Sequence, residues 1–422
     1  MSDAVVINKA APATDIPDPY SIPLSDIDVS GAELFRADKQ DAYFERLRRE
    51  DPVHYCADSQ YGPYWSVTKF NDIVYVDTHH QIYSSDSQLG GVVMRGQPEE
   101  TALPMFIAMD PPKHDAQRKV VQPIVAPSNL AKLESTIRER AGRILDSLPR
   151  NETFNWVDLV SIELTTQMLA TLFDFPFEDR RKLTEWSDAA TSEEDAKTPE
   201  LEEARRAKIF ECADYFMGLW NERVNAREPG GDLISMLAHG ESTRYMDRGE
   251  FIGNLLLLIV GGNDTTRNSI TGGLLALNQN PDQYRKLREN HKLIETMVPE
   301  IIRWQTPLTH MRRTALADTE LGGKQIKKGD KVIMWYISGN RDDEVIPDPY
   351  SFIIDRKNPR QHLSFGFGIH RCVGNRLAEM QLRIIWEEAM KRFDFIEVVG
   401  DPVRTNSNLI HGYLELPVRI AG

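Results

Sequence analysis

A cysteine near the C-terminus is the residue of this chain best placed to do chemistry. Cys372 lies between Gly368 and Gly374, directly after His370 and Arg371, at the start of a predicted helix. Glycines let a backbone approach a flat cofactor closely, and the N–H groups at a helix N-terminus lower the pKa of a thiol. The arrangement indicates a thiolate that acts as axial ligand to a heme iron. The alternative is a buried cysteine that packs as a small hydrophobic residue.

The composition excludes several other classes of protein. The chain has 422 residues and a net charge of −14, which argues against nucleic acid as a partner because phosphate binding needs a basic surface. Its three cysteines have no paired spacing, which suits a reducing compartment rather than a disulfide framework. We find no signal peptide and no apolar run near the roughly 20 residues of a membrane span. We therefore expect a cytoplasmic protein with a flexible arm over residues 1–20 and a single catalytic domain over 21–422.

The cysteine segment resembles the heme-binding motif of the cytochrome P450 superfamily. Five positions match it: Phe365, Gly368, His370, Cys372 and Gly374. The resemblance implies a mainly α fold with minor β, in which heme lies between a long central helix and the cysteine loop. It also implies bound heme b (iron protoporphyrin IX) with O2 as co-substrate, and heme contacts from Phe365, His370 and Gly374.

A long helix is expected from about 249 to 279, and it carries Gly261, Gly262, Asp264 and Thr265. Two glycines inside a helix cost about 1 kcal/mol each relative to alanine. They indicate either close approach to something flat or tight packing against a neighbouring helix. In the family pattern that this segment resembles, Thr265 hydrogen-bonds dioxygen and Asp264 relays protons from solvent, which suits a reaction that consumes two protons.

Two further motifs pair charged residues with one another. His114 and Arg118 lie four apart on a predicted helix and share one face; that face is either solvated or turned to an anion. By resemblance, His114, Arg118, Arg313 and His370 bind the heme propionates.

The motif Glu300-Ile301-Ile302-Arg303 is, taken alone, compatible with an ordinary surface pair. By resemblance it forms, with Arg356, a buried cluster behind the heme that holds the loop presenting Cys372.

Strand-like segments flank the helical middle of the chain. Residues 51–70 alternate around Gly62-Pro63 and predict a β-hairpin, and the Gly-Gly pair within 320–326 predicts a second one. Residues 332–335 form a short apolar run typical of a buried strand, and 413–418 alternate like a strand.

The segments 263–269, 305–315 and 334–342 resemble the bacterial alkane terminal-hydroxylase family. This resemblance implies hydroxylation of the terminal methyl of medium-chain alkanes, alcohols or fatty acids. The loop 89–106 is a candidate lid over the substrate, with Val92, Val93, Met94, Leu103 and Met105. The other expected channel residues are Leu257, Leu258, Gly261, Leu308, Thr309 and Leu409. Hydroxylation of a bulkier lipid such as a terpene or steroid, and a heme-binding protein without catalysis, are the alternatives.

Electrons for such a reaction must come from another protein, because the sequence shows no motif for a bound flavin or iron–sulfur cluster. By family analogy the donor is a ferredoxin, reduced by an NAD(P)H-dependent ferredoxin reductase. It would dock near Cys372 on a basic patch of Arg118, Lys119, Arg371 and Arg376. The substrate is expected to be a hydrophobic small molecule.

Overall fold

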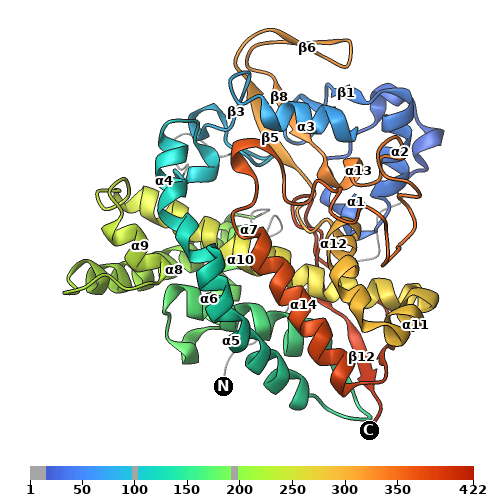
Figure 1. Ribbon diagram of the computed structural model, residues 1–422. Coiled ribbons are helices and arrows are strands. Elements are labelled where there is room, and N and C mark those ends of the chain that lie inside the picture. The colour runs from blue at the N-terminus through green and yellow to red at the C-terminus, as the bar shows by residue number, and fades with distance from the viewer. Residues whose placement is uncertain (1–15, 97–102, 192–197) are drawn as a thin grey trace.

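The structure is a computed structural model, and it describes residues 16–96, 103–191 and 198–422. Helices make up most of the molecule, and the strands of the main sheet gather at the top in Figure 1. The mainly α class with minor β is therefore confirmed. The helices are α1 (Ala32–Arg36), α2 (Gln40–Glu50), α3 (Phe70–Thr78), α4 (Lys113–Val121), α5 (Pro127–Asp146), α6 (Glu163–Phe173), α7 (Lys182–Thr191), α8 (Pro199–Val224), α9 (Leu233–His239), α10 (Arg248–Gln279), α11 (Pro281–Glu289), α12 (Ile294–Gln305), α13 (Tyr336–Gly339) and α14 (Asn375–Arg392).

The strands form one main sheet and three small ones. The main sheet has five strands in the order β1-β2-β8-β5-β3, and only the β2–β8 pair is parallel. Three strands form the sheet β4-β12-β9, and two-stranded sheets join β6 to β7 and β10 to β11. The strands are β1 (Val53–Cys56), β2 (Tyr64–Val67), β3 (Tyr83–Ser84), β4 (Thr153–Asn155), β5 (Met311–Ala315), β6 (Thr319–Leu321), β7 (Lys324–Ile326), β8 (Lys331–Met334), β9 (Ile396–Val398), β10 (Val403–Arg404), β11 (Tyr413–Glu415) and β12 (Pro417–Ile420).

Both predicted hairpins are present. β1 and β2 pair antiparallel, with Val53 opposite Val67. β6 and β7 are joined by Gly322 and Gly323, whose φ angles of 55° and 76° lie in the left-handed region. A two-residue turn of this kind requires positive φ at both positions, and this explains the glycine pair.

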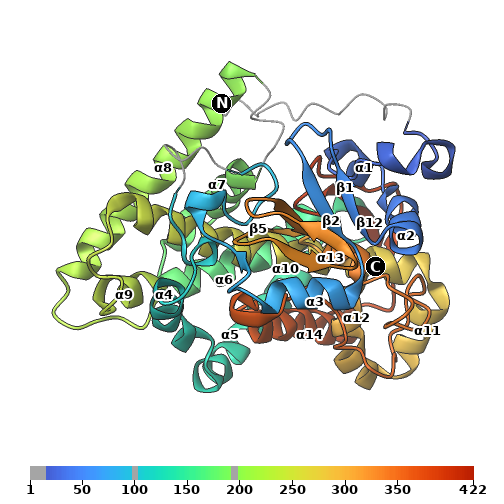
Figure 2. The ribbon, with the colours of Figure 1, turned by 90° about the horizontal axis from the view of Figure 1, so that it is seen from above.

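The central helix α10 is buried on almost every side. Its first turn is capped by Asp247, whose carboxylate accepts from the backbone N–H of Glu250. The helix packs against α6, α7, α12 and α14, and α14 in turn lies along α5 in both Figure 1 and Figure 2. A helix enclosed in this way is apolar around most of its circumference, so the polar residues in its middle need a specific reason to be there.

Two predictions from the sequence concern a membrane span and the N-terminal arm. No helix in the described ranges is long and apolar enough to cross a membrane. Of the proposed N-terminal arm, residues 1–15 lie outside the described residues, whereas the carbonyl of Pro17 accepts a hydrogen bond from the Tyr43 hydroxyl at 2.6 Å.

Candidate active site

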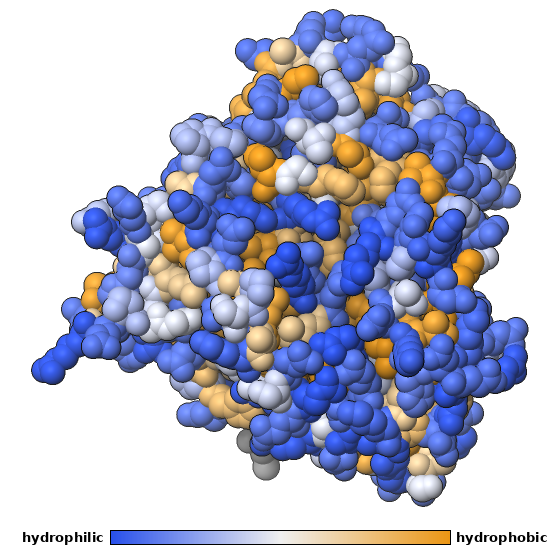
Figure 3. All heavy atoms as spheres, viewed as in Figure 1, coloured by the Kyte–Doolittle hydropathy of each residue, from blue (hydrophilic) through white to orange (hydrophobic). Residues whose placement is uncertain are grey.

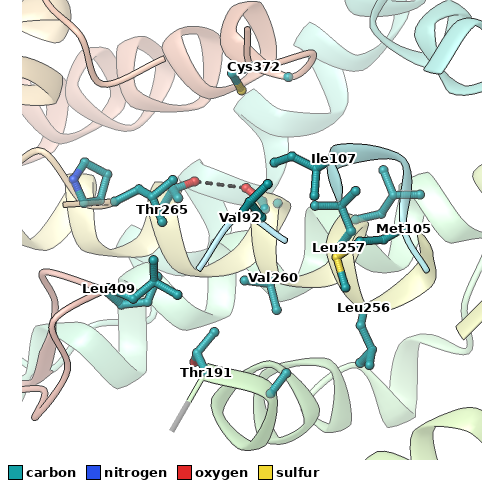
Figure 4. Close-up of a pocket in the computed structure, with 18 of the residues that line it drawn as sticks. Val92, Met105, Ile107, Thr191, Leu256, Leu257, Val260, Thr265, Cys372 and Leu409 are labelled. Atoms are coloured by element: carbon teal, nitrogen blue, oxygen red, sulfur yellow. Dashed lines mark hydrogen bonds between the residues drawn. The ribbon is translucent and has the colours of Figure 1, made fainter. Parts of the chain in front are cut away.

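A cavity of about 790 Å³ lies between α10 and the segment that carries Cys372. Figure 4 shows Cys372 on one side of it and Thr265 of α10 across from it. The cavity is lined by five of the six expected channel residues: Leu257, Leu258, Gly261, Leu308 and Leu409.

Thr309, the sixth, is not among the described residues that line the cavity. Its side chain is fully buried, and its hydroxyl donates to the carbonyl of Asn408. The expectation that residue 309 forms part of the wall therefore does not match its position, because the strand-like run places Leu308 toward the cavity and turns residue 309 away.

The thiol of Cys372 faces this cavity rather than the outer surface. The loop before it folds back on itself, so that the backbone N–H of Cys372 donates to the carbonyl of Phe365 at 2.8 Å. Desolvation by the surrounding protein raises the pKa of the thiol, whereas the backbone N–H groups of Gly374 and Asn375 and the charge of Arg118 lower it. These N–H groups belong to the start of α14, as a helix N-terminus acting on a thiolate requires.

Two buried residues, His114 and Arg313, and two half-buried ones, Arg118 and His370, gather beside Cys372. Arg118, Arg313 and His370 line the cavity, and the His114 ring contacts that of His370 with centroids 4.4 Å apart. Among the described residues, Nε2 of His114 and both ring nitrogens of His370 are buried without a hydrogen-bond partner. Burial, then the charge of Arg313, holds the pKa of His370 far below its ordinary value. Unpartnered buried donors and cations of this kind are satisfied by an anion such as a carboxylate.

The two neighbouring arginines of β5 point in different directions. Arg313 lines the cavity. Arg312 instead donates from Nη2 to the carbonyl of Leu89 at 2.9 Å, and its side chain lies against Gly90 and Gly96. The alternation of side chains along a strand explains the difference, and it places Arg313, as expected, on the side of Cys372.

The adjacent glycines of α10 also differ in their surroundings. A Cβ built at Gly261 meets no atom within 4 Å, because this position faces the cavity. A Cβ built at Gly262 lies 2.7 Å from Cδ2 of Leu169 on α6. Both readings of the glycine pair therefore hold, one for each residue: Gly261 opens the cavity, and Gly262 permits tight helix packing. The hydroxyl of Thr265 donates to the carbonyl of Gly261 at 2.9 Å, which fixes its place on the cavity wall.

Asp264 lies at the inner end of a charged chain that reaches the surface. Its carboxylate is fully buried, accepts from Ser187 Oγ at 3.0 Å and pairs with Arg267 at 3.0 Å. The same guanidinium pairs at 2.5 Å with Asp188, whose side chain is 49% exposed. Burial raises the pKa of Asp264, and the charge of Arg267 opposes this. A carboxyl shifted toward neutral pH is suited to giving and taking protons.

The expected cluster of Glu300, Arg303 and Arg356 is present and buried. Glu300 accepts from Arg303 Nε and Nη2, both at 2.8 Å, and from Arg356 Nε at 3.0 Å. The backbone N–H of Ile353 adds a further bond to this carboxylate at 2.9 Å. One carboxylate thus binds two guanidinium groups and a backbone N–H in the interior.

This cluster connects to the cysteine loop through Asn340. Arg303 donates to the carbonyl of Asn340 at 3.0 Å. The Asn340 side chain accepts from the backbone N–H of Leu363 at 2.6 Å and donates to the hydroxyl of Ser364 at 2.9 Å. Ser364 directly precedes Phe365, so the buried charges hold the beginning of the loop.

Part of the cavity wall comes from helices that no sequence motif marked. In sequence, the apolar side chains of α6 and α8 are indistinguishable from ordinary core. In the structure, Phe210 differs from a core residue, because it is 62% exposed. Arg205 and Arg206 of α8 also line the cavity. The apolar lining residues of these two helices are Met168, Leu169, Leu172, Ile209 and Phe210. Of the candidate lid, Val92, Val93, Met94, Leu103 and Met105 line the cavity, and residues 97–102 lie outside the described ranges.

The donor set around Cys372 fits heme. A thiol faces the cavity, Gly261 leaves the opposite wall open, and the unpartnered His114 and His370 nitrogens stand where carboxylates would satisfy them. Heme is flat, carries two propionates and accepts a cysteine thiolate as axial ligand, so the residues present match its requirements.

Comparisons with known proteins agree with this geometry. The family model for Cytochrome P450 matches residues 53–418. The fold is similar to that of CYP153D17 from Sphingomonas sp. PAMC 26605, with 49% identity and a TM-score of 0.89 over 94% of this chain and 99% of that one. Cytochrome P450-153 from Novosphingobium aromaticivorans gives 47% identity and a TM-score of 0.89 over 93% and 99%. Linalool 8-monooxygenase of Pseudomonas putida is 38% identical over 405 residues, which are 93% of this chain and 98% of that protein.

These findings confirm the resemblance to bacterial P450 enzymes of the alkane terminal-hydroxylase group. They also confirm the P450 fold and the assignment as an oxidoreductase. The chain belongs to the cytochrome P450 family, whose members are heme-dependent monooxygenases.

Proposed function

We propose that this monooxygenase hydroxylates the terminal methyl group of medium-chain alkanes, alcohols or fatty acids. The observation that carries the proposal is the apolar cavity opposite Cys372, walled by Leu257, Leu308 and Leu409. A terminal C–H bond is stronger than its secondary neighbours, so attack at the chain end requires a channel that presents only that end. The similarity to two CYP153 structures supports the same class of reaction.

The residues around the cavity have different roles toward heme. Heme, when bound, supplies the activation of O2 and the insertion of one oxygen atom into a C–H bond. Cys372 would bind the heme iron through its thiolate, and His114, Arg118, Arg313 and His370 would bind the heme carboxylates. Phe365 and Gly374 would contact the same group from the loop and from the start of α14.

On the opposite wall, Thr265 lines the cavity, and its hydroxyl would hydrogen-bond dioxygen after turning its single O–H away from the Gly261 carbonyl. Asp264 would supply protons to this side, because its raised pKa suits giving and taking protons. Arg267, which stays charged, pairs with both Asp264 and the exposed Asp188 and so links the buried carboxylate to the surface. Glu300, Arg303 and Arg356 would act structurally, by holding the loop that presents Cys372.

Charged residues lining the cavity favour the acids within this substrate class. Arg205 and Arg206 both pair with Glu202, at 2.8 and 2.9 Å, and all three line the cavity from α8. Two guanidinium groups share one carboxylate, so a net positive charge remains to pair with the carboxylate of a fatty acid.

The test is turnover of a homologous series of alkanes, primary alcohols and fatty acids with a surrogate ferredoxin system, and identification of the hydroxylated carbon by mass spectrometry. We expect terminal products, with several chain lengths accepted because one methylene is worth only about 1–3 kcal/mol. Mainly subterminal products would contradict the proposal. A carbon monoxide difference spectrum of the reduced protein provides the control for heme–thiolate ligation.

A bulkier lipid is the second candidate, favoured by the similarity to linalool 8-monooxygenase. Titration of the resting enzyme with linear acids, terpenes and sterols, followed by the heme absorption spectrum, separates the two. Tighter binding of terpenes or sterols than of any linear chain would favour this second candidate.

We further propose that a ferredoxin, reduced by an NAD(P)H-dependent reductase, docks on the face nearest Cys372. Lys119, Arg371 and Arg376 are exposed on this face, and Figure 3 shows that hydrophilic residues predominate over it. Charge reversal by Lys119→Glu with Arg376→Glu should raise the apparent KM for the ferredoxin. Arg285→Glu with Arg288→Glu, two exposed positions on α11, is the matched control, and equal KM values for the two double variants would refute the docking site.

A further inference from the structure

A buried carboxylate at the end of α3 has no part in the function described so far. Asp77 is the second-last residue of α3, and only 2% of it is exposed. A carboxylate this deeply buried costs several kcal/mol unless it is paired and hydrogen-bonded. Its partners therefore indicate why it is there.

Asp77 binds three segments that meet beside Cys372. Its Oδ1 accepts from Nη2 of Arg313 on β5 at 2.7 Å. Its Oδ2 accepts from the backbone N–H of Phe367 in the cysteine loop at 2.7 Å and from the hydroxyl of Tyr336 on α13 at 3.1 Å. The carboxylate thus ties a cavity-lining arginine to the loop that presents the thiol.

The loop also rests directly on the backbone of α3. Gly368 has a φ of 63°, and a Cβ built there would lie 2.3 Å from the carbonyl oxygen of Asp77. Only glycine permits this approach. The ring of Phe367 meets that of Phe70, at the start of α3, edge to face with centroids 6.3 Å apart. The side chain of Asp77 fixes the loop five residues before Cys372, and its main chain meets the loop four residues before it.

Arg313 keeps donors available after it pairs with Asp77. Nη2 donates to Asp77 and Nη1 donates to the carbonyl of Arg312 at 2.8 Å, whereas a guanidinium has five N–H donors in all. The arginine lines the cavity next to His370, so its remaining N–H groups can bind a heme carboxylate while Asp77 holds the other side.

We propose that Asp77 is a positioning residue that shares Arg313 with a heme carboxylate, and that its charge lowers the reduction potential of the heme. A negative charge in a low-dielectric surrounding acts strongly over short distances and favours the oxidised, more positive state of the iron. Partners one shell beyond the contacts of a metal group tune its potential and its retention. The inference holds whatever the substrate is.

The test compares Asp77→Asn with Asp72→Asn in the purified holoenzyme. Asparagine keeps the shape of Asp77 and can still accept from Phe367, but it lacks the charge and turns an amide N–H toward Arg313. Asp72 lies on the same helix, is half-buried and has the same charge. We expect Asp77→Asn to raise the reduction potential and to speed heme transfer to an apoprotein acceptor about 10-fold or more. The Asp72→Asn variant should match the wild type in both.

Two results would overturn the proposal. If Asp77→Asn loses heme faster but keeps the wild-type reduction potential, the residue is merely structural; if it matches Asp72→Asn in both measurements, it has no role at the heme. Should Asp77→Asn fail to retain heme at all, Asp77→Glu keeps the charge and displaces the carboxylate by one methylene. That variant should then show the wild-type potential with faster heme loss, and a wild-type rate of heme loss would contradict the positioning role.

Discussion

Replacing Gly261 with alanine tests which wall of the cavity meets the substrate. The added methyl meets no protein atom within 4 Å, and it points into the cavity. Glycine inside a helix costs about 0.5–1 kcal/mol relative to alanine, so Gly261→Ala should stabilise the fold slightly. For a chain of this size that is a rise in Tm of about 1 °C. The same methyl narrows the space above the heme site.

The expected effect on substrates follows from the size of one methyl group. A single methyl added to an apolar pocket changes discrimination by about 1–3 kcal/mol, or about 10–200-fold in kcat/KM. A linear chain has no branch to collide with the new methyl, whereas a branched or cyclic lipid does. Gly261→Ala should therefore lower kcat/KM for terpenes and sterols by this factor and leave linear alkanes and acids within a few-fold of the wild type. Initial rates of product formation with each class, at several concentrations, provide the measurement.

Gly273→Ala is the matched control, twelve residues further along the same helix. Its methyl would lie 2.7 Å from Cδ1 of Ile301, which is 1% exposed, and neither residue is among the described residues that line the cavity. Overpacking of this kind costs about 1–3 kcal/mol, which exceeds the gain from removing a helical glycine. Gly273→Ala should lower Tm and leave substrate preference unchanged. If both variants shift substrate preference equally, or if neither does, Gly261 does not face the substrate and the reasoning fails.

Three further predictions concern the proton path, the buried charges and pH. Thr265→Ala should divert reducing equivalents from product to hydrogen peroxide, whereas Thr265→Ser should not; full coupling in the alanine variant would exclude the proposed role. Glu300→Gln leaves two buried guanidinium groups without their carboxylate and should cost about 3–5 kcal/mol of stability in denaturant unfolding. The surface change Glu379→Gln should cost at most about 1 kcal/mol. Similar losses of stability in the two variants would contradict the structural role of Glu300. Burial lowers the pKa of His310 to about 4, so as the pH falls this imidazole is protonated in the unfolded chain before it is protonated in the folded one. The free energy of unfolding should therefore fall as the pH drops from about 6.5 toward 4. His310→Gln should make the free energy of unfolding depend less on pH over this range.

Much of the fold and of the chemistry could be predicted because the signals are local in sequence. The Gly322-Gly323 pair specified a hairpin, since few other residues adopt positive φ twice in succession. The helix expected from about 249 to 279 is observed at Arg248–Gln279, and Asp247 caps its start. The face shared by His114 and Arg118 followed from helical periodicity alone.

The rest depends on contacts between distant segments, which periodicity cannot reveal. The different surroundings of Gly261 and Gly262 arise from α6, which lies about ninety residues earlier in the chain. The lining residues of α6 and α8 have the same composition as core residues, so no local pattern separates the two roles. Asp77 is 236 residues from Arg313 and 290 from Phe367, and an aspartate near the end of a helix carries no local sign of such partners.

The position of the thiol follows from the way in which the loop around it is held. A loop satisfies few of its backbone groups internally, and groups buried without partners are costly. Here side chains supply partners from two directions: Asn340, held by Arg303, binds the loop at Leu363 and Ser364, and Asp77 binds it at Phe367. Each attachment depends on a buried ion pair, which contributes little net stability but is costly to break. Both attachments reach the loop five to nine residues before Cys372. The cost of the two buried ion pairs is therefore best understood as the requirement for holding one sulfur atom at a fixed place opposite Thr265.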